Sequence, residues 1–329
     1  MDLLKRLILL VLISGLVLPA VNAQKSVTDF LDMGKEDARI MSEAYLRPYG
    51  EMLGNTLNGG WYNSARVHRV GGFSLTMGVN MAMVPSSGKN FDVAPLLNQM
   101  QGGWTLKDAN NHLAPTVAGK MPASVRPVLQ QGNQDVLTLP DGSGFDKFPM
   151  PMAQVSVGLP FRSEISMRLV PSISAGDAGK VNLIGFGFKH SVKEYLPVIK
   201  HMPLVHSSVL VGYTHLGSEV NVTPNADFAG SNQKLEINSN GFTSRFLLGV
   251  NIPVIALYTG VGYGSTNSDF DLTGNYGSLG NNPFSLAYKT SGFDFNAGMR
   301  LRLGILAIFG DYTFGDYSMA TLGVGLSFR

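Results

Sequence analysis

The sequence contains no cysteine, so disulfide bonds do not contribute to the stability of this protein. Charged residues are also scarce: they make up 15% of the chain, whereas about 25% is usual in soluble domains. The formal net charge is only +2, and the basic residues form neither a stripe nor a block, so the composition gives no reason to expect nucleic acid as a partner. Glycine, by contrast, is abundant with 39 residues, which disfavours a mostly helical protein.

Residues 1–23 have the three parts of a secretory signal peptide. Lys5 and Arg6 give the positive start, an apolar run extends from Leu7 to Leu18, and Val21-Asn22-Ala23 provides the small-residue site. A membrane anchor is the alternative, but the apolar run is shorter than the roughly 20 residues that a helix needs to cross a bilayer. The sequence therefore predicts export, with cleavage near Ala23.

The C-terminal segment alternates strictly between large apolar residues and small or polar ones. Leu322, Val324 and Phe328 share one parity, and threonine, glycine and serine occupy the other. A period of two is typical of a β-strand whose two faces meet different surroundings. The same pattern recurs upstream and predicts ten strands, with residues 57–66 as a candidate for a further one. The ten ranges are 71–84, 151–159, 162–171, 180–190, 205–217, 235–250, 253–270, 284–302, 304–314 and 318–328.

A soluble β-sandwich also alternates, but three features favour a transmembrane barrel. The polar faces are rich in glycine, the chain is predicted to be exported, and tight turns such as 251–253 alternate with longer polar loops. Short turns at one end and long loops at the other are typical of outer-membrane barrels. Only a closed barrel or a helix satisfies every backbone group in lipid. The predicted fold is all-β: a transmembrane antiparallel β-barrel of about 10–12 strands with an N-terminal helical plug-like segment.

Ahead of the barrel, residues 24–58 follow a helical period. Ala38, Met41 and Tyr45 recur at helical spacing, with charged residues between them. We expect an amphipathic helix that plugs the lumen; a helix outside the barrel or a periplasmic arm is the alternative. The predicted organisation is a signal peptide at 1–23, a plug segment at 24–58 and a barrel at 59–329 with a long external loop at 86–149.

Three resemblances add to this interpretation. The C-terminal strand, with Phe328 near its end, resembles the signal that the barrel-assembly machinery reads in bacterial outer-membrane barrels, which implies that machinery as a partner. The runs Y-L-R-P-Y-G-E-M-L-G-N-T-L-N-G-G-W-Y-N-S-A-R at 45–66 and G-G-F-S-L-T at 71–76 resemble an uncharacterised family of Gram-negative outer-membrane β-barrels. The plug, barrel and rim helix are more distantly similar to the long-chain fatty-acid outer-membrane transporters, whose usual Asn-Pro-Ala motif is absent here. These resemblances imply a location in the cell outer membrane of a Gram-negative bacterium.

Six charged residues lie on the parity that is predicted to face the lumen. In one interpretation they line a permeation path or bind an anionic head group. In the other they form a structural salt-bridge network against the charged N-terminal helix, which we favour because a small barrel has little spare lumen. The six candidates are Glu164, Arg168, Lys189, Arg245, Asp294 and Arg300.

Only a few residues in the sequence suggest catalysis or metal binding. His206 and Ser208 have the two-residue spacing of membrane-embedded lipid hydrolases, and their parity directs them to the lumen; ordinary polar rim residues are the alternative. His190, His201 and His206 cluster near a predicted rim helix at 191–196, but they lack the i, i+4 pair of a metal site. We therefore predict that the protein is not an enzyme and has no catalytic residue, cofactor or metal site.

The leading functional hypothesis is an outer-membrane barrel, with an occluded or narrow lumen, that passes or captures a small hydrophobic solute. The rival from a different class is a structural or assembly protein of the envelope without channel activity, and a lipid hydrolase is the minor alternative. The loop at 86–149 is long enough to be functional and is hypothesised to form a lid or a receptor surface. Outer-membrane lipid is the expected surrounding of the barrel.

Overall fold

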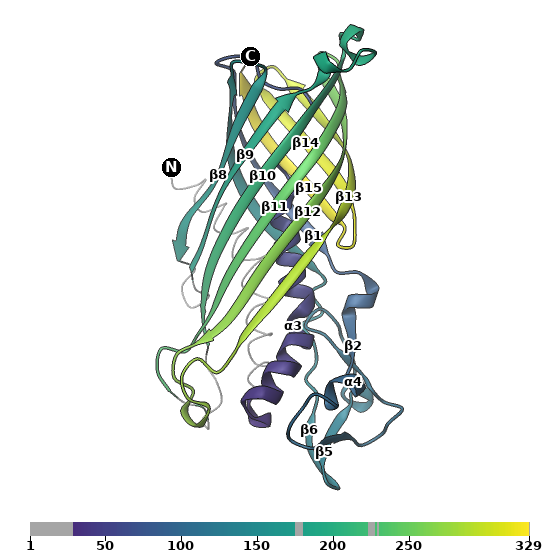
Figure 1. The fold of residues 1–329 in the computed structure, drawn as a ribbon, viewed down its shortest axis with the longest axis vertical. Coiled ribbons are helices and arrows are strands. Elements are labelled where there is room, and N and C mark those ends of the chain that lie inside the picture. The colour runs from purple at the N-terminus through teal and green to yellow at the C-terminus, as the bar shows by residue number, and fades with distance from the viewer. Residues whose placement is uncertain (1–28, 175–179, 223–227, 229, 329) are drawn as a thin grey trace.

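The computed structural model describes residues 29–174, 180–222, 228 and 230–328, so the predicted signal peptide lies outside the described residues. Ten antiparallel strands form one closed barrel (Figure 1), which confirms the predicted all-β barrel at the lower end of its strand range. The barrel strands are β1 (Phe73–Met83), β7 (Lys147–Leu159), β8 (Ser163–Ser174), β9 (Lys180–Ser191), β10 (Val205–Asn221), β11 (Lys234–Asn251), β12 (Ile255–Thr273), β13 (Ser285–Leu303), β14 (Leu306–Phe314) and β15 (Met319–Phe328).

The barrel closes where β1 pairs with both β7 and β15. Phe73 stands opposite Phe328, and their rings stack with centroids 4.7 Å apart. Along β15 the alternation seen in the sequence separates two faces: Leu322 and Val324 are 66% and 55% exposed, whereas Thr321 is buried. The large residues of the last strand therefore point away from the lumen, and the small ones point into it.

The same division holds on the longer strands. On β12, Leu257 and Val261 are exposed on the outer face, while Tyr258 is buried inside. Exposed aliphatic and aromatic side chains on the outer face, around a polar interior, are typical of a barrel that is surrounded by lipid. Within the described ranges, no helix is both long and apolar enough to cross a membrane.

The two ends of the barrel differ in their connections. At one end, which we call the turn rim, strands are joined by short segments such as 252–254 and 304–305. The opposite end, the loop rim, carries the connections 84–146 and 274–284. A short helix was expected near 191–196 at the turn rim, and two 3₁₀-helices occur there, Lys193–Tyr195 and Ile199–His201.

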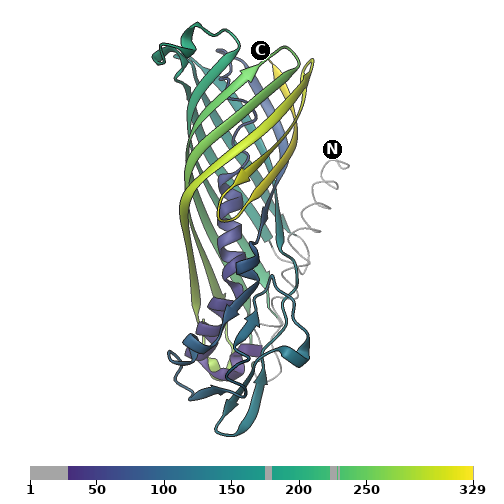
Figure 2. The same ribbon diagram turned by 90° about the vertical axis from the view of Figure 1, so that its right-hand side faces the viewer.

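Helix α3 (Lys35–Asn58), preceded by the 3₁₀-helix η2 (Leu31–Met33), enters the barrel from the loop rim (Figures 1 and 2). It ends inside the lumen, and the irregular segment 59–72, which we call the inner segment, continues to β1 at the turn rim. The candidate strand at 57–66 is therefore wrong: α3 occupies its first residues and the rest forms no strand. Side chains of the barrel wall, rather than a neighbouring strand, bind the backbone carbonyls there.

The connection 84–146 folds into a small unit, which we call the cap, beside α3 at the loop rim (Figure 2). Apolar side chains from the N-terminal helical segment and the cap, among them Phe30, Tyr45, Trp104 and Leu129, share one buried core with the protruding ends of the barrel strands. The cap contains β2 (Asn90–Asp92), α4 (Ala94–Leu97), β3 (Trp104–Leu106), β4 (Leu113–Pro115), β5 (Val128–Gln131) and β6 (Gln134–Thr138).

Candidate functional site: the plugged lumen and its vestibule

Trp61 fills the middle of the lumen directly after α3 ends. Its side chain is among the largest that are fully buried, and it packs on the backbone of β9 and β10. A Cβ atom added to Gly187 or Gly212 would lie 2.8 Å or 2.6 Å from the indole ring. The glycines on the inner face thus make room for the plug. Gly260 and Gly264 do the same, since an added Cβ atom would lie 2.7 Å from the hydroxyl of Tyr62 or 2.9 Å from Nδ2 of Asn58.

Arg168 holds the end of the helix against the barrel wall. Its guanidinium donates to the carbonyl oxygens of Leu57 and Gly59, at 3.2 Å and 2.6 Å, and lies 3.7 Å above the centroid of the Trp61 ring. The last carbonyls of a helix lack partners within the helix and carry partial negative charge, so a cation there stabilises the helix end. Arg168 is 1% exposed, so its removal would take a buried donor from both carbonyls, of which only that of Leu57 also accepts from the hydroxyl of Thr214.

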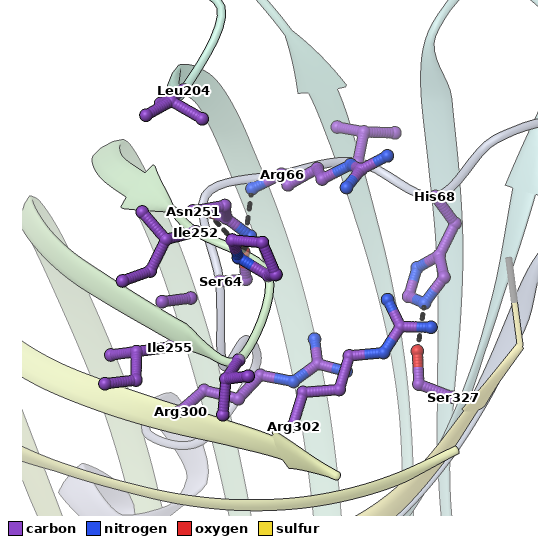
Figure 3. Close-up of a pocket in the computed structure, with 14 residues that line it drawn as sticks. Ser64, Arg66, His68, Leu204, Asn251, Ile252, Ile255, Arg300, Arg302 and Ser327 are labelled. Atoms are coloured by element: carbon purple, nitrogen blue, oxygen red, sulfur yellow. Dashed lines mark hydrogen bonds between the residues drawn. The ribbon is translucent and has the colours of Figure 1, made fainter. Parts of the chain in front are cut away.

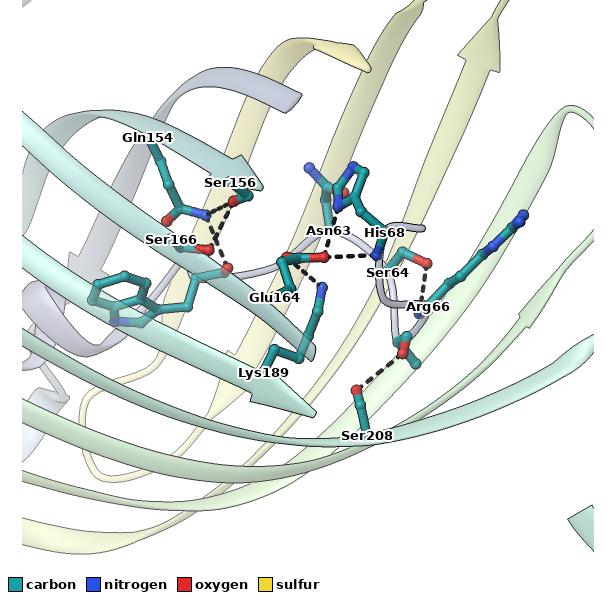
Figure 4. Close-up of polar contacts among 12 residues, drawn as sticks. Asn63, Ser64, Arg66, His68, Gln154, Ser156, Glu164, Ser166, Lys189 and Ser208 are labelled. Carbon is teal, nitrogen blue, oxygen red and sulfur yellow. Dashed lines mark hydrogen bonds and ion pairs between the residues drawn. The ribbon is translucent and has the colours of Figure 1, made fainter. Parts of the chain in front are cut away.

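Glu164 ties two strands to the inner segment near the turn rim (Figure 4). Its Oε1 lies 2.9 Å from Lys189 Nζ, while its Oε2 accepts from the backbone N–H of His68 at 2.9 Å and lies 2.6 Å from His68 Nδ1. All three side chains are largely buried. A buried charge is tolerated only when it is paired and hydrogen-bonded in this way.

On the other side of the lumen, charged and phenolic groups form a second network. Arg245 makes a two-pronged ion pair with Asp294, one prong measuring 2.8 Å between Nη2 and Oδ2. Tyr62 donates to Asn296 Oδ1 at 2.7 Å. Arg300 donates to Asn63 Oδ1 at 3.0 Å, so this network also reaches the inner segment.

The structure places the six candidate residues from the sequence on the lumen side. Arg168, Glu164 and Arg300 contact α3 or the inner segment, whereas Lys189 and Asp294 pair with charges of the wall. These contacts accord with a structural network rather than with an open permeation path. Sequence reasoning missed Trp61, Arg66 and His68, because the inner segment has no periodicity that could assign its side chains to a face. Arg302 shares the parity of Arg300 near the end of β13, so strand alternation could have found it, but it was not among the candidates.

A vestibule opens between the inner segment and the turn 251–256 at the turn rim (Figure 3). Its cavity volume is about 310 Å³, and its walls include Arg66, His68, Arg300 and Arg302, while no described residue contributes a carboxylate to them. Two further cavities, of about 420 Å³ and 530 Å³, lie at the loop rim beside α3.

At the loop rim, buried polar contacts join α3 to the cap. The carboxylate of Asp37 accepts from the backbone N–H groups of Gln101 and Gly102, at 2.8 Å and 2.9 Å, and from the indole N–H of Trp104 at 2.9 Å. Tyr49 donates to the carbonyl oxygen of Phe145 at 3.2 Å, and burial raises the pKa of its phenol to about 12. The helix and the cap are therefore one packed unit.

Of the histidine and serine candidates, Ser208 and His190 are engaged in other contacts. The hydroxyl of Ser208 donates to the carbonyl of Ala65 at 2.9 Å, which directs it at the inner segment. His190 lies 2.9 Å from the hydroxyl of Ser163 and stacks between aromatic rings. In the part of the chain that the structure describes, no three histidine, aspartate or glutamate residues are grouped for a metal ion.

The chain belongs to a family of unknown function (DUF6588), whose model matches residues 2–328. None of the curated proteins matches it. Among solved structures it is similar to the translocator domain of the autotransporter NalP from Neisseria meningitidis, with 10% identity, 84% of this chain and 91% of that chain covered, and a TM-score of 0.34. It is also similar to the outer membrane protease OmpT from Escherichia coli (7% identity, 78% and 96% covered, TM-score 0.33) and to the toluene transporter TodX from Pseudomonas putida (8% identity, 78% and 68% covered, TM-score 0.27). These similarities are remote, and no activity is inferred from them.

Proposed function

We propose that this protein is an outer-membrane barrel that anchors a folded cap at the cell surface, and that its own N-terminal segment keeps the lumen closed. The class of function is thus that of a structural or interaction protein of the envelope rather than an open channel. One observation carries the proposal. The buried Arg168 is hydrogen-bonded to the end of α3 and stacked on Trp61, so the plug is part of the packed interior.

The outer face of the barrel supports the membrane location. Exposed apolar side chains cover the strands from the turn rim to a level marked by Tyr213, Phe242, Tyr263 and Phe293. Aromatic residues are typical at the boundary between the apolar band of a barrel and the head groups. Beyond that level the outer faces of β11 and β12 become polar, as at Asn240 and Asn267.

The connections support an orientation. Outer-membrane barrels have short turns on the periplasmic side and long loops outside, so the turn rim would face the periplasm and the cap would face the medium. In this orientation β1 begins and β15 ends at the periplasmic rim, which also leaves the C-terminal strand accessible to the barrel-assembly machinery.

Planar bilayers test the closed lumen. We expect no stepwise conductance from the intact protein. A variant without residues 24–58 should lose the heat-modifiable barrel fold, because Arg168 and the glycine-lined wall then face an empty lumen. Arg168→Met should lower stability without producing conductance, and Arg162→Met, at an exposed position on the turn rim, is the matched control. A truncated barrel that stays folded and conducts would contradict the proposal and favour a plugged channel.

Capture of a small hydrophobic solute is a second candidate function, favoured by the cavity of about 530 Å³ between α3 and the cap. Pro48, Phe91 and Leu96 contribute apolar lining, and the volume is that of a small-molecule site. We expect 1-N-phenylnaphthylamine to fluoresce on binding the purified protein and Phe91→Asp to abolish that signal. An unchanged signal in Phe91→Asp would exclude this cavity as the site.

A further inference from the structure

Three arginines converge on the vestibule at the turn rim. Arg66 comes from the inner segment, and Arg300 and Arg302 come from the last turn-rim residues of β13 (Figure 3). His68 lies on the same side of the cavity. Bringing several like charges into one small cavity is unfavourable unless an opposite charge offsets them.

No carboxylate of the described chain pairs directly with these three arginines. None of the three arginines forms an ion pair with a described residue, and the lining of the vestibule contains neither aspartate nor glutamate. The carboxylate of Glu164, which contacts His68, already has both oxygens engaged by Lys189 and His68. The excess positive charge in the vestibule is therefore left for a ligand.

The guanidinium groups also retain donors that are free to bind. Nε of Arg300 is buried and has no hydrogen-bond partner among the described residues, although Nη1 of the same group donates to Asn63. Arg302 uses Nε on the carbonyl of Gly304, and its other nitrogens have no bond to a described residue. A buried donor without a partner costs free energy, and an oxyanion in the cavity would satisfy it.

We propose that the vestibule is a binding site for a phosphate group. The planar fork of arginine matches phosphate oxygens in pairs, and three such forks suit a tetrahedral anion better than a single carboxylate. The other wall of the cavity is apolar, with Leu204, Ile252 and Val254 about half exposed at the rim. Arginine beside apolar side chains suits the phosphate of an anionic phospholipid, while free phosphate is the second source of the same chemistry.

Two probes distinguish the sources, using the full-length protein purified in dodecyl maltoside. Native mass spectrometry measures adducts with phosphatidylglycerol and with diacylglycerol, which lacks the phosphate. Calorimetry measures binding of inorganic phosphate. The variants are Arg66→Gln, Arg302→Gln and their combination, and the matched control is Lys200→Gln, which removes a positive charge from an exposed position on the same rim outside the cavity. Retention of the heat-modifiable fold shows that each variant is folded.

We expect the wild-type protein to bind phosphatidylglycerol in preference to diacylglycerol. Each arginine removed should weaken binding by about tenfold, whereas Lys200→Gln should leave it unchanged. Binding of inorganic phosphate with the same dependence on Arg66 and Arg302 would assign the site to the soluble anion. The proposal is overturned if the wild-type protein binds neither phosphatidylglycerol nor phosphate, or if the combined variant binds them as tightly as the wild type.

Discussion

At the scale of single residues, the lumen is shaped by glycines that lie against the plug. A Cβ on Gly212 would lie 2.6 Å from Trp61 Cε2, which is too close for the indole to stay in place. We expect Gly212→Ala to lower the free energy of unfolding by about 1–3 kcal/mol through overpacking. Urea titration in detergent, followed by the heat-modifiable mobility of the barrel, measures this loss.

Two controls show whether the loss of stability comes from overpacking against Trp61 or from replacing any strand glycine by alanine. Gly292 also lies on a barrel strand, but its nearest neighbour to an added Cβ is 3.7 Å away, so Gly292→Ala should be close to neutral. In the Trp61→Phe background, Gly212→Ala should cost less, and a double-mutant cycle gives the coupling between the two sites. Equal losses in both backgrounds would refute a direct clash with the indole.

Residue parity predicted which charges point inward, but it did not predict their partners. Glu164 and Arg168 lie on the inner face because strand alternation is a local property of the sequence. Their contacts with His68 and Gly59 depend on how the inner segment runs through the lumen. That path follows from packing with residues far away in the chain, and no local pattern in 59–72 reports it.

At the scale of elements, the strands were easier to predict than the helix. Each of the ten predicted ranges overlaps a barrel strand, because period-two alternation marks both the existence and the faces of a strand. A helical period in the N-terminal segment indicates a buried stripe, but it does not give the direction in which the helix enters the barrel. The cap was predicted as a long loop at 86–149 that forms a lid or a receptor surface. Its internal elements were not predicted, since its strands of three to five residues are too short to show a period.

The joint between α3 and the cap depends on Asp37. Its buried carboxylate accepts from two backbone N–H groups and from the indole of Trp104. We expect Asp37→Ala to loosen the cap, because three donors lose their acceptor at about 1–3 kcal/mol for each one that stays buried. Limited proteolysis should then cleave within 84–146 while the barrel keeps its heat-modifiable fold. Glu36→Ala, which changes the neighbouring exposed position, should leave the cap resistant, and equal cleavage in both variants would contradict this role.

At the scale of the whole molecule, the course of the chain has a consequence for topology. The first and last strands of the barrel meet at one rim, since Phe73 and Phe328 are paired at the turn rim. The start of α3 lies at the opposite rim (Figure 1). If the turn rim faces the periplasm, the chain passes from the cell surface through the lumen before it begins β1.

Site-specific labelling tests this course directly, because the natural chain contains no cysteine. Lys35 is exposed at the first turn of α3, and Lys200 is exposed in the 3₁₀-helix at the turn rim. We expect a membrane-impermeant maleimide to label Lys35→Cys on intact cells, whereas Lys200→Cys should react only after the outer membrane is permeabilised. The reverse pattern would invert the proposed orientation. Labelling of neither variant before permeabilisation would place both ends of the barrel out of reach of the medium, which contradicts display of the cap at the cell surface.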